Sequence, residues 1–172
     1  MVLVPRRASS FRQVEFLRLS DQRVLLIIVA PVGDVQYRVL FTEEEVSARL
    51  AEIAAEIDAE YQGKDVLLVG VLTGAVMVMA DLSRALTIHC SMDWMAISSY
   101  GSGTQSSGVV RILKDLNTDI SGRHVLVVED IIDTGLTLSY LASNLRSREP
   151  ASLQIMTMFR KPEAAENAVD VR

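Results

Sequence analysis

Residues Val125 to Thr137 read V-L-V-V-E-D-I-I-D-T-G-L-T, and this stretch decides the fold. The apolar, β-branched run at its start is typical of a strand that is buried on both faces of a parallel sheet. Two adjacent carboxylates, Glu129 and Asp130, stand at the end of that strand. A short turn follows, and then a helix-like segment from Leu136 to about Arg146. The stretch therefore predicts a strand, a turn and a helix in succession, as in α/β proteins.

The turn after this strand has the features of an anion-binding site. Asp133, Thr134 and Gly135 form the turn, and the N-terminus of the helix follows it. Unpaired amides and the helix dipole favour a phosphate group there, glycine lets the backbone approach closely, and the hydroxyls of Thr134 and Thr137 add donors. Two carboxylates would repel an anion alone, so the ligand should also carry hydroxyls or a divalent cation. An ordinary connection between a strand and a helix is the alternative interpretation.

The composition fits one domain of 172 residues with an aliphatic core, since 49% of the residues are hydrophobic and only 5% are aromatic. The formal net charge of -5 argues against a nucleic-acid surface spread over the whole domain. The single cysteine, Cys90, excludes an intrachain disulfide and fits a reducing compartment, so we expect a cytoplasmic protein. The longest apolar run, Val24 to Ala30, is far too short to span a membrane.

Hydrophobic periodicity and turn residues predict the other elements. Thr42 and Glu45 form a capping box, so a helix begins at Thr42, and Gln62–Gly63 ends it. The polar, glycine-rich segment 100–108 is a candidate mobile lid. The expected strands cover Val66–Leu72, Met92–Ser98, Val109–Lys114, His124–Glu129 and Leu153–Phe159.

A second helix is expected over Ala75–Leu86, directly after the first of these strands. Its helical spacing predicts that Val76 and Met79 pack against the sheet. Met77 and Met79 are interpreted as core-filling side chains rather than as part of a cofactor site.

Strands that alternate with helices imply an α/β fold with a central, mostly parallel sheet flanked by helices. Ligands bind at the carboxyl ends of the strands in such sheets. Four marked segments lie at those ends, and we expect them to line one cleft: Leu72–Gly74, Ser98–Tyr100, Glu129–Thr137 and Arg160–Lys161.

The stretch Glu129–Thr137 resembles the phosphoribosyl-pyrophosphate (PRPP) motif of type I phosphoribosyltransferases, and its E-D-I-I-D-T-G form is most similar to the hypoxanthine-guanine branch. Val69–Ala75 resembles the pyrophosphate-binding loop of that family, Ser98–Asp115 its mobile loop, and Phe159–Pro162 the segment whose lysine meets the purine. The resemblance covers about Val35–Arg172 and is closest to bacterial, actinobacterial-like members. It implies the type I, Rossmann-like fold and transfer of a 5-phosphoribosyl group from PRPP to hypoxanthine or guanine, with release of pyrophosphate.

The resemblance also implies roles for the acidic pair and the turn. Glu129 and Asp130 would hold the ribose hydroxyls and would meet Mg²⁺ only indirectly, through Mg²⁺-PRPP. The residues that would bind the 5′-phosphate are Asp133, Thr134, Gly135, Leu136 and Thr137. Asp133 would also be the general base that takes the N7 proton of the purine. A helix N-cap is the alternative role for Asp133.

The family's pyrophosphate-binding turn corresponds to Leu72, Thr73 and Gly74, whose amides would bind pyrophosphate. In the family this turn often carries an unusual cis peptide, which we expect between Leu72 and Thr73. Position 73 departs from the family, because many relatives carry Lys where this chain has Thr. Pyrophosphate binding would then rest on backbone amides, with a lower affinity for PRPP.

The lid and the purine site are implied in the same way. Ser99 and Tyr100 would close with the lid and exclude water from the reaction. Lys161 would donate to the exocyclic oxygen at position 6 of the purine, and a surface lysine is the alternative. Ile131 would pack on the face of the purine, although a place in the core is equally open.

The two ends of the chain depart from the family pattern. The family usually begins near Asp34, so residues 1–33 are interpreted as an N-terminal extension that is partly disordered, and residues 34–172 as the phosphoribosyltransferase domain. Val24–Ala30 forms an extra strand in this extension or packs on a partner. Beyond the position of Arg172 the family has a further strand and a purine-stacking segment, so we expect impaired substrate binding by these residues alone.

Two interpretations of other classes remain open. One is a regulatory protein that binds PRPP as a signal and a nucleic acid as output, and the other is an inactive remnant that serves in assembly. A different base specificity, such as xanthine or a pyrimidine, is also open. The leading interpretation expects no nucleic-acid or membrane partner, and a homo-oligomer (dimer or tetramer) because relatives usually form one.

Overall fold

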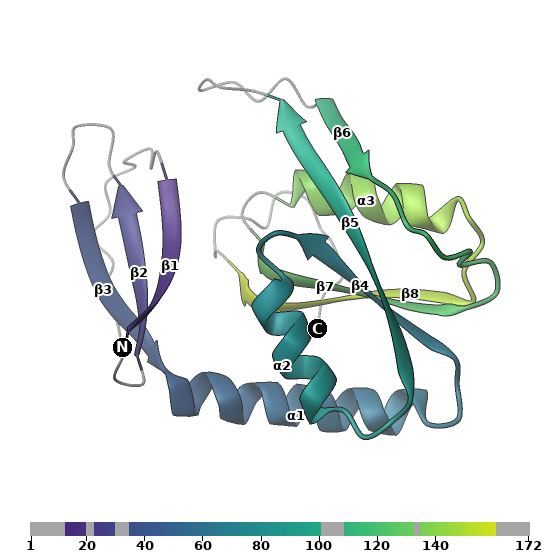
Figure 1. Cartoon of the computed structure of the whole chain (residues 1–172), viewed down its shortest axis with the longest axis horizontal. Helices are drawn as coiled ribbons and strands as arrows, with labels where there is room; N and C mark the ends of the chain where they lie inside the picture. Colours follow the sequence, from purple (N-terminus) through teal and green to yellow (C-terminus); the bar gives the residue numbers. More distant parts are fainter. Residues whose placement is uncertain (1–12, 20–22, 30–34, 101–108, 133–134, 161–172) are drawn as a thin grey trace. The chain divides into compact units, whose positions relative to one another are not determined.

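The computed structural model describes residues 13–19, 23–29, 35–100, 109–132 and 135–160 (Figure 1). The chain divides into two compact units, residues 1–49 and residues 50–172. Within the described ranges, no helix has both the length and the apolar character needed to cross a lipid bilayer.

The first unit contains a three-stranded antiparallel sheet in the order β1–β2–β3. β1 covers Gln13–Leu19, β2 covers Arg23–Val29 and β3 covers Val35–Thr42. Of the two interpretations of Val24–Ala30, the extra strand is present as β2, which begins and ends one residue earlier. β1 was not predicted, because the alternation of apolar residues in this segment shifts its phase at Leu17.

Helix α1 covers Glu43–Tyr61 and begins with the expected capping box. The Thr42 amide donates to the Glu45 carboxylate over 2.7 Å, and the Glu45 amide donates to the Thr42 hydroxyl over 3.2 Å. These reciprocal bonds satisfy two backbone donors that a helix start leaves unpaired. Gly63, with a φ of 75°, follows the end of the helix in the left-handed conformation that favours glycine.

The second unit contains a five-stranded sheet in the order β6–β5–β4–β7–β8. Strands β5, β4, β7 and β8 are parallel, and the edge strand β6 runs antiparallel to β5. The expected mostly parallel sheet is thus confirmed. The strands are β4 (Val66–Leu72), β5 (Cys90–Tyr100), β6 (Val109–Lys114), β7 (His124–Ile132) and β8 (Ser152–Arg160), and the helices of this unit besides α1 are α2 (Val76–Ala85) and α3 (Leu136–Arg146).

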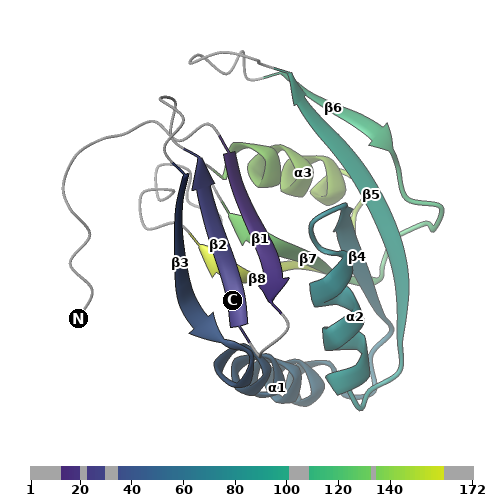
Figure 2. The same cartoon turned by 60° about the vertical axis from the view of Figure 1, so that its left-hand side comes forward.

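Helices cover both faces of this sheet. Leu67 and Val69 of β4 belong to the apolar cluster that packs against α3, while Leu68 belongs to the cluster that packs against α1 and α2. Figures 1 and 2 show α3 on the opposite side of the sheet from these two helices. Because both faces are covered, β4 is buried almost along its whole length, as the continuous apolar run predicts.

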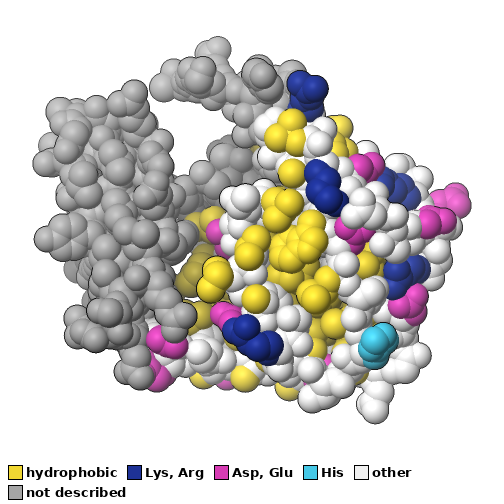
Figure 3. All heavy atoms as spheres, viewed as in Figure 1, with side chains coloured by type: hydrophobic (Ala, Val, Ile, Leu, Met, Phe, Trp, Pro, Cys, Tyr) yellow, Lys and Arg dark blue, Asp and Glu magenta, His cyan; other side chains and the backbone are white. Residues whose placement is uncertain are grey.

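The start of α2 differs from the prediction. Met79 and Leu82 are buried, but Val76 is 40% and Met77 is 60% exposed, so the prediction that these two side chains fill the core is wrong. A helix turns by about 100° per residue, so the side chain two positions before Met79 points away from the core. Figure 3 shows hydrophobic side chains gathered on the face of the molecule that carries α2 and β5 in Figure 1.

Candidate active site

The parallel strands bring their carboxyl ends to one edge of the sheet. Leu72, the last residue of β4, pairs with Ala96 of β5, which continues to Tyr100. Ile132 ends β7 and pairs with Arg160, the last residue of β8. The segments that the sequence analysis marked after β4, β5, β7 and β8 therefore leave the sheet at the same edge.

The turn after β4 lies directly against the acidic pair. A Cβ atom added to Gly74 would lie 2.6 Å from Oδ2 of Asp130 and 2.7 Å from its Cγ and Oδ1 atoms, so the carboxylate occupies the space that any larger residue would need. This contact joins the predicted pyrophosphate turn to the predicted ribose-binding carboxylates.

The same turn has an unusual backbone. The peptide bond between Leu72 and Thr73 is cis, which confirms the expectation from the sequence. Within the turn, the Ala75 amide donates to the Val71 carbonyl over 3.2 Å and the Val76 amide donates to the Thr73 carbonyl over 3.3 Å. Neither of these bonds uses the amide of Thr73 itself.

The acidic pair at the end of β7 holds a strongly perturbed carboxyl group. Burial, a hydrogen bond with Asp130 and the negative charge of Asp130 together raise the pKa of Glu129 from 4.5 to about 9. Asp130 Oδ1 accepts a hydrogen bond from the amide of Ile131 over 2.8 Å. At neutral pH the pair therefore carries a proton on Glu129 and is fixed to the backbone through Asp130.

Helix α3 begins at Leu136, directly after a glycine. Gly135 stands at the N-cap position with a φ of 75°, and as a glycine it has no side chain with which to cap the helix. The Ser139 amide donates to the Gly135 carbonyl over 2.8 Å, which is the first bond of the helix. The amides that precede Ser139 lie in the first turn, where the helix dipole favours an anion. Leu136 is 41% exposed and Thr137 is half-buried, so this turn faces the solvent in part.

A cavity of ≈ 240 Å³ lies between these segments. It brings together five residues that the sequence analysis marked, and its full lining is Val71, Leu72, Ile97, Glu129, Ile131, Ile132, Gly135, Thr137 and Leu138. Thr73 and Gly74 follow one lining residue directly, and Asp130 lies between two others. The cavity therefore has a polar rim of carboxyl, hydroxyl and backbone groups over an apolar floor.

The apolar part of the cavity lining was not predicted from the sequence. Val71, Ile97, Ile132 and Leu138 line the cavity, although none of these four side chains was assigned a role in the site. Strand periodicity could have indicated Ile97, because Met95, two residues earlier, is buried in the cluster under α3 and side chains two apart share a face.

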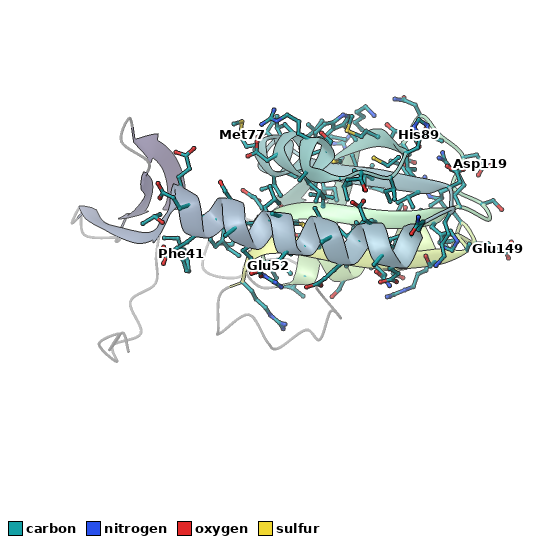
Figure 4. All side chains as sticks on the ribbon, turned by 90° about the horizontal axis from the view of Figure 1, so that it is seen from below. Phe41, Glu52, Met77, His89, Asp119 and Glu149 are labelled. Carbon is teal, nitrogen blue, oxygen red and sulfur yellow. The ribbon has the colours of Figure 1, made fainter. Side chains whose placement is uncertain are left out.

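A larger cavity of ≈ 370 Å³ lies elsewhere, lined by Asp58, Ala59, Gln62, Gly63, Lys64, Thr87, Ile88 and His89. Figure 4 shows His89 at the end of the unit away from Met77 of α2. Burial alone would raise the pKa of Asp58, but hydrogen bonds from the Thr87 hydroxyl and from the amides of Thr87 and Ile88 outweigh it and lower that pKa. The Asp58 carboxylate is thus already used to join α1 to the residues before β5. For this reason the larger cavity is not the candidate site.

The acidic pair fits a magnesium ion that brings ligands of its own. In the part of the chain that the structure describes, no cluster of three or more His, Cys, Asp or Glu side chains could hold a metal ion. Glu129 and Asp130 are half-buried and supply the hard oxygen donors that Mg²⁺ prefers. Mg²⁺ usually keeps several waters and shares substrate phosphates, so a pair of carboxylates beside bound phosphates would be sufficient for it.

Several predicted site residues lie outside the described residues. These are Asp133 and Thr134 in the turn before α3, Lys161 after β8, and the lid tip at 101–108. Ser99 and Tyr100 are described only as the last backbone positions of β5, where they pair with Val110 and Val109. Their assigned roles remain predictions.

Comparisons with known proteins identify the family. The model of the phosphoribosyl transferase domain matches residues 38–171, and the model of the HrcA protein C terminal domain matches residues 1–71. The hypoxanthine-guanine phosphoribosyltransferase of Mycobacterium tuberculosis is 50% identical over 145 residues, which cover 81% of this chain and 71% of that protein. The enzyme of the same name from Bacillus subtilis is 48% identical over 125 residues, covering 73% of this chain and 69% of that protein.

Solved structures similar to this chain come from the same family. A hypoxanthine phosphoribosyltransferase from Staphylococcus aureus superimposes with a TM-score of 0.75 at 40% identity, over 78% of this chain and 73% of that one. The hypoxanthine phosphoribosyltransferase of Trypanosoma cruzi gives a TM-score of 0.71 at 42% identity, over 77% and 76% of the two chains. With the cis turn, the acidic pair and the start of α3 meeting at one cavity, this chain belongs to the hypoxanthine-guanine branch of the phosphoribosyltransferase family.

Proposed function

We propose that this chain is a purine salvage enzyme that transfers the 5-phosphoribosyl group of PRPP to hypoxanthine or guanine, giving IMP or GMP and pyrophosphate. The observation that carries the proposal is the contact between the turn after β4 and the acidic pair near the end of β7, in a cavity that Gly135 and Thr137 at the start of α3 also line. A substrate with a diphosphate, a ribose and a 5′-phosphate would meet each of these three segments.

The acidic pair would hold the ribose of PRPP. Asp130 keeps its carboxylate fixed through the Ile131 amide, so its other oxygen can accept a hydrogen bond from a ribose hydroxyl. Glu129 binds a proton in the free chain, and a cation beside the pair would favour the ionised form. Bound Mg²⁺ would neutralise the charge that develops on the departing pyrophosphate.

Backbone amides would hold the two phosphate ends of PRPP. The amides of Thr73 and Gly74 would face the pyrophosphate, because the hydrogen bonds within the turn are donated by the amides of Ala75 and Val76. The 5′-phosphate would bind to the turn before α3 and to its first residues: Asp133, Thr134, Gly135, Leu136 and Thr137. The helix dipole adds a favourable potential for the phosphate there.

In the reaction, the bond from the ribose C1′ to the pyrophosphate oxygen breaks and a bond from C1′ to the purine nitrogen forms. Asp133 would take the N7 proton that the purine loses in this step. Lys161 would donate to the oxygen at position 6, and Ile131 would pack against the purine ring. Ser99 and Tyr100 would close over the site with the lid and keep water from C1′.

The first test is the formation of IMP and GMP from PRPP, Mg²⁺ and each base by the purified chain. In Asp133→Asn, product formation should fall by about 10²–10⁴-fold while PRPP still binds, because general acid–base catalysis contributes about that much. Asp119→Asn is the matched control, since Asp119 lies with His89 at the end of the unit away from Met77 (Figure 4). Wild-type rates in Asp133→Asn, or no product from the folded wild-type chain with either base, would contradict the proposal.

The compartment, the oligomeric state and the partners of the chain also follow from the proposed function. We propose a cytoplasmic homo-oligomer, a dimer or tetramer, that uses Mg²⁺ and has neither a nucleic-acid nor a membrane partner. The phosphoribosyltransferase domain would begin near residue 34. A regulatory PRPP-binding protein is the alternative, and a nucleic-acid binding assay at increasing salt would separate the two, because phosphate contacts weaken steeply with salt.

A further inference from the structure

Gly74 is a glycine for reasons of space rather than of backbone conformation. The described glycines with a positive φ are Gly63, Gly122 and Gly135, and Gly74 is not among them. An alanine at this position would therefore be acceptable to the backbone. What excludes it is the carboxylate of Asp130, which a new Cβ would approach to 2.6 Å.

The carboxylate cannot move away freely. Its Oδ1 atom accepts the 2.8 Å hydrogen bond from the Ile131 amide, and its side chain is hydrogen-bonded with Glu129. The backbone behind it belongs to β7, which pairs with β8 through Glu129 opposite Thr157 and Ile131 opposite Phe159. A displaced carboxylate would lose these bonds in a partly buried place, where an unpaired charged group is costly.

We propose that Gly74 is a positioning residue for the phosphoribosyl donor, because its missing side chain lets the Asp130 carboxylate lie against the turn after β4. This inference rests on the proposed function and deepens it. Asp130 would face the ribose of PRPP and the turn would face its pyrophosphate. The contact therefore sets the distance between the groups that hold the two parts of the donor.

This arrangement couples two segments that are far apart in the sequence. A shift of the turn after β4 would move the carboxylate, and a change at the carboxylate would free the turn. Binding energy for PRPP depends on both groups meeting the ligand at the same time. A variant that separates them should thus lose affinity for PRPP while the binding of the free purine changes little.

The experiment is a double-mutant cycle of Gly74→Ala, Asp130→Ala and the variant with both changes. Without ligand, Gly74→Ala should lower the melting temperature by at least about 2 °C in the wild-type background. In the Asp130→Ala background the same change should be neutral or stabilising, because the obstructing carboxylate is gone. Equal losses in both backgrounds, or no loss in either, would overturn the contact as the reason for Gly74.

The second half of the cycle measures PRPP binding with Mg²⁺ by calorimetry. Gly74→Ala should raise the dissociation constant at least about 10-fold, and the doubly changed variant should bind no worse than Asp130→Ala alone. In kinetics, the KM for PRPP should rise much more than the KM for the purine. An unchanged dissociation constant in Gly74→Ala would refute the positioning role.

Gly122→Ala serves as the control for general destabilisation. Gly122 has a φ of 69° and no atom within 4 Å of an added Cβ, so this change strains the backbone without touching the site. It should lower the melting temperature and leave PRPP binding unchanged. If the wild-type chain binds no PRPP at all, the proposed function fails, while the ligand-free melting cycle still decides whether Asp130 is what excludes a side chain at Gly74.

Discussion

The fold stabilises Glu129 in its protonated form, whereas the proposed site would use the ionised form. Its burial, its hydrogen bond with Asp130 and the charge of Asp130 raise its pKa to about 9, whereas the unfolded chain releases the same proton near the ordinary value of 4.5. Between these two values the folded chain binds one proton more than the unfolded chain. The free energy of unfolding therefore falls as the pH rises through this window, by at most about 1.4 kcal/mol per pH unit.

We predict that Glu129→Gln is more stable than the wild type at neutral pH, because the amide keeps the shape and never ionises. The difference in melting temperature should be small near pH 4.5 and should grow steadily up to about pH 9. Thermal unfolding at a series of pH values measures it. Glu149→Gln is the control, since Figure 4 places Glu149 at the end of the unit away from Met77. A difference that does not vary with pH would contradict the prediction.

Other residues show what the sequence can and cannot specify at this scale. Glu129, Asp130 and the cis bond after Leu72 were predicted from short motifs, whose residues are adjacent in the chain. The contact of Gly74 with Asp130 was not, because it depends on how β4 and β7 align in the sheet. The apolar floor at Ile97 was missed for a related reason, since an aliphatic residue in a strand carries no chemical mark of a site.

At the scale of the element, Asp93 of β5 holds the segment that follows β6. Its carboxylate accepts hydrogen bonds from the amides of Trp94, Asn117 and Thr118 over 2.8, 2.7 and 2.9 Å, and Lys114 Nζ lies 3.6 Å from it. It is the one charged side chain that is fully buried among the described residues. Burial alone would raise the pKa of Asp93, but these hydrogen bonds outweigh it and hold the pKa below 3.8.

We predict that Asp93→Ala lowers the free energy of unfolding by about 2–4 kcal/mol, because it leaves three partly buried amide bonds without their acceptor. Urea denaturation at neutral pH measures the loss. Asp81→Ala is the control, since Asp81 forms an exposed ion pair with Arg84 and such pairs contribute about 0–1 kcal/mol. The lowered pKa means that the contribution of Asp93 is present above pH 3.8 and shrinks as the pH falls through the folded value. Equal losses in the two variants would contradict this account.

The sequence predicted the ends of a strand correctly where the whole strand is buried. It predicted them wrongly where strand pairing continues beyond the buried residues. β4 was predicted to the residue, because helices on both faces require an unbroken apolar run. β7 was predicted to end at Glu129 but continues to Ile132, since its pairing with β8 extends to Arg160. The carboxylates therefore lie within the strand's last residues rather than in a loop, which explains why their backbone is fixed.

At the scale of the whole molecule, the net charge of the chain has the same sign as the charge of PRPP. The chain has a formal net charge of -5, and PRPP is itself strongly anionic, so the overall field does not attract the substrate. In the proposed function, affinity would come from local amides at the turn after β4 and at the start of α3, and from the cation that accompanies the substrate. Under the proposed function, the acidic net charge of the chain would add to the need for a magnesium ion with the substrate.

We predict that PRPP stabilises the folded chain only when magnesium is present. At a PRPP concentration 100 times its dissociation constant, the stabilisation should be about 2.7 kcal/mol, or about 5–10 °C in melting temperature for a chain of this length. Chelation of the magnesium should remove most of this shift, and magnesium alone should cause almost none, because the described residues contain no metal cluster of their own. Ribose 5-phosphate with magnesium is the matched ligand, since it lacks the diphosphate and should stabilise much less. A full shift with PRPP after chelation would show that the amides alone hold the diphosphate, and that the acidic pair serves the ribose without a metal.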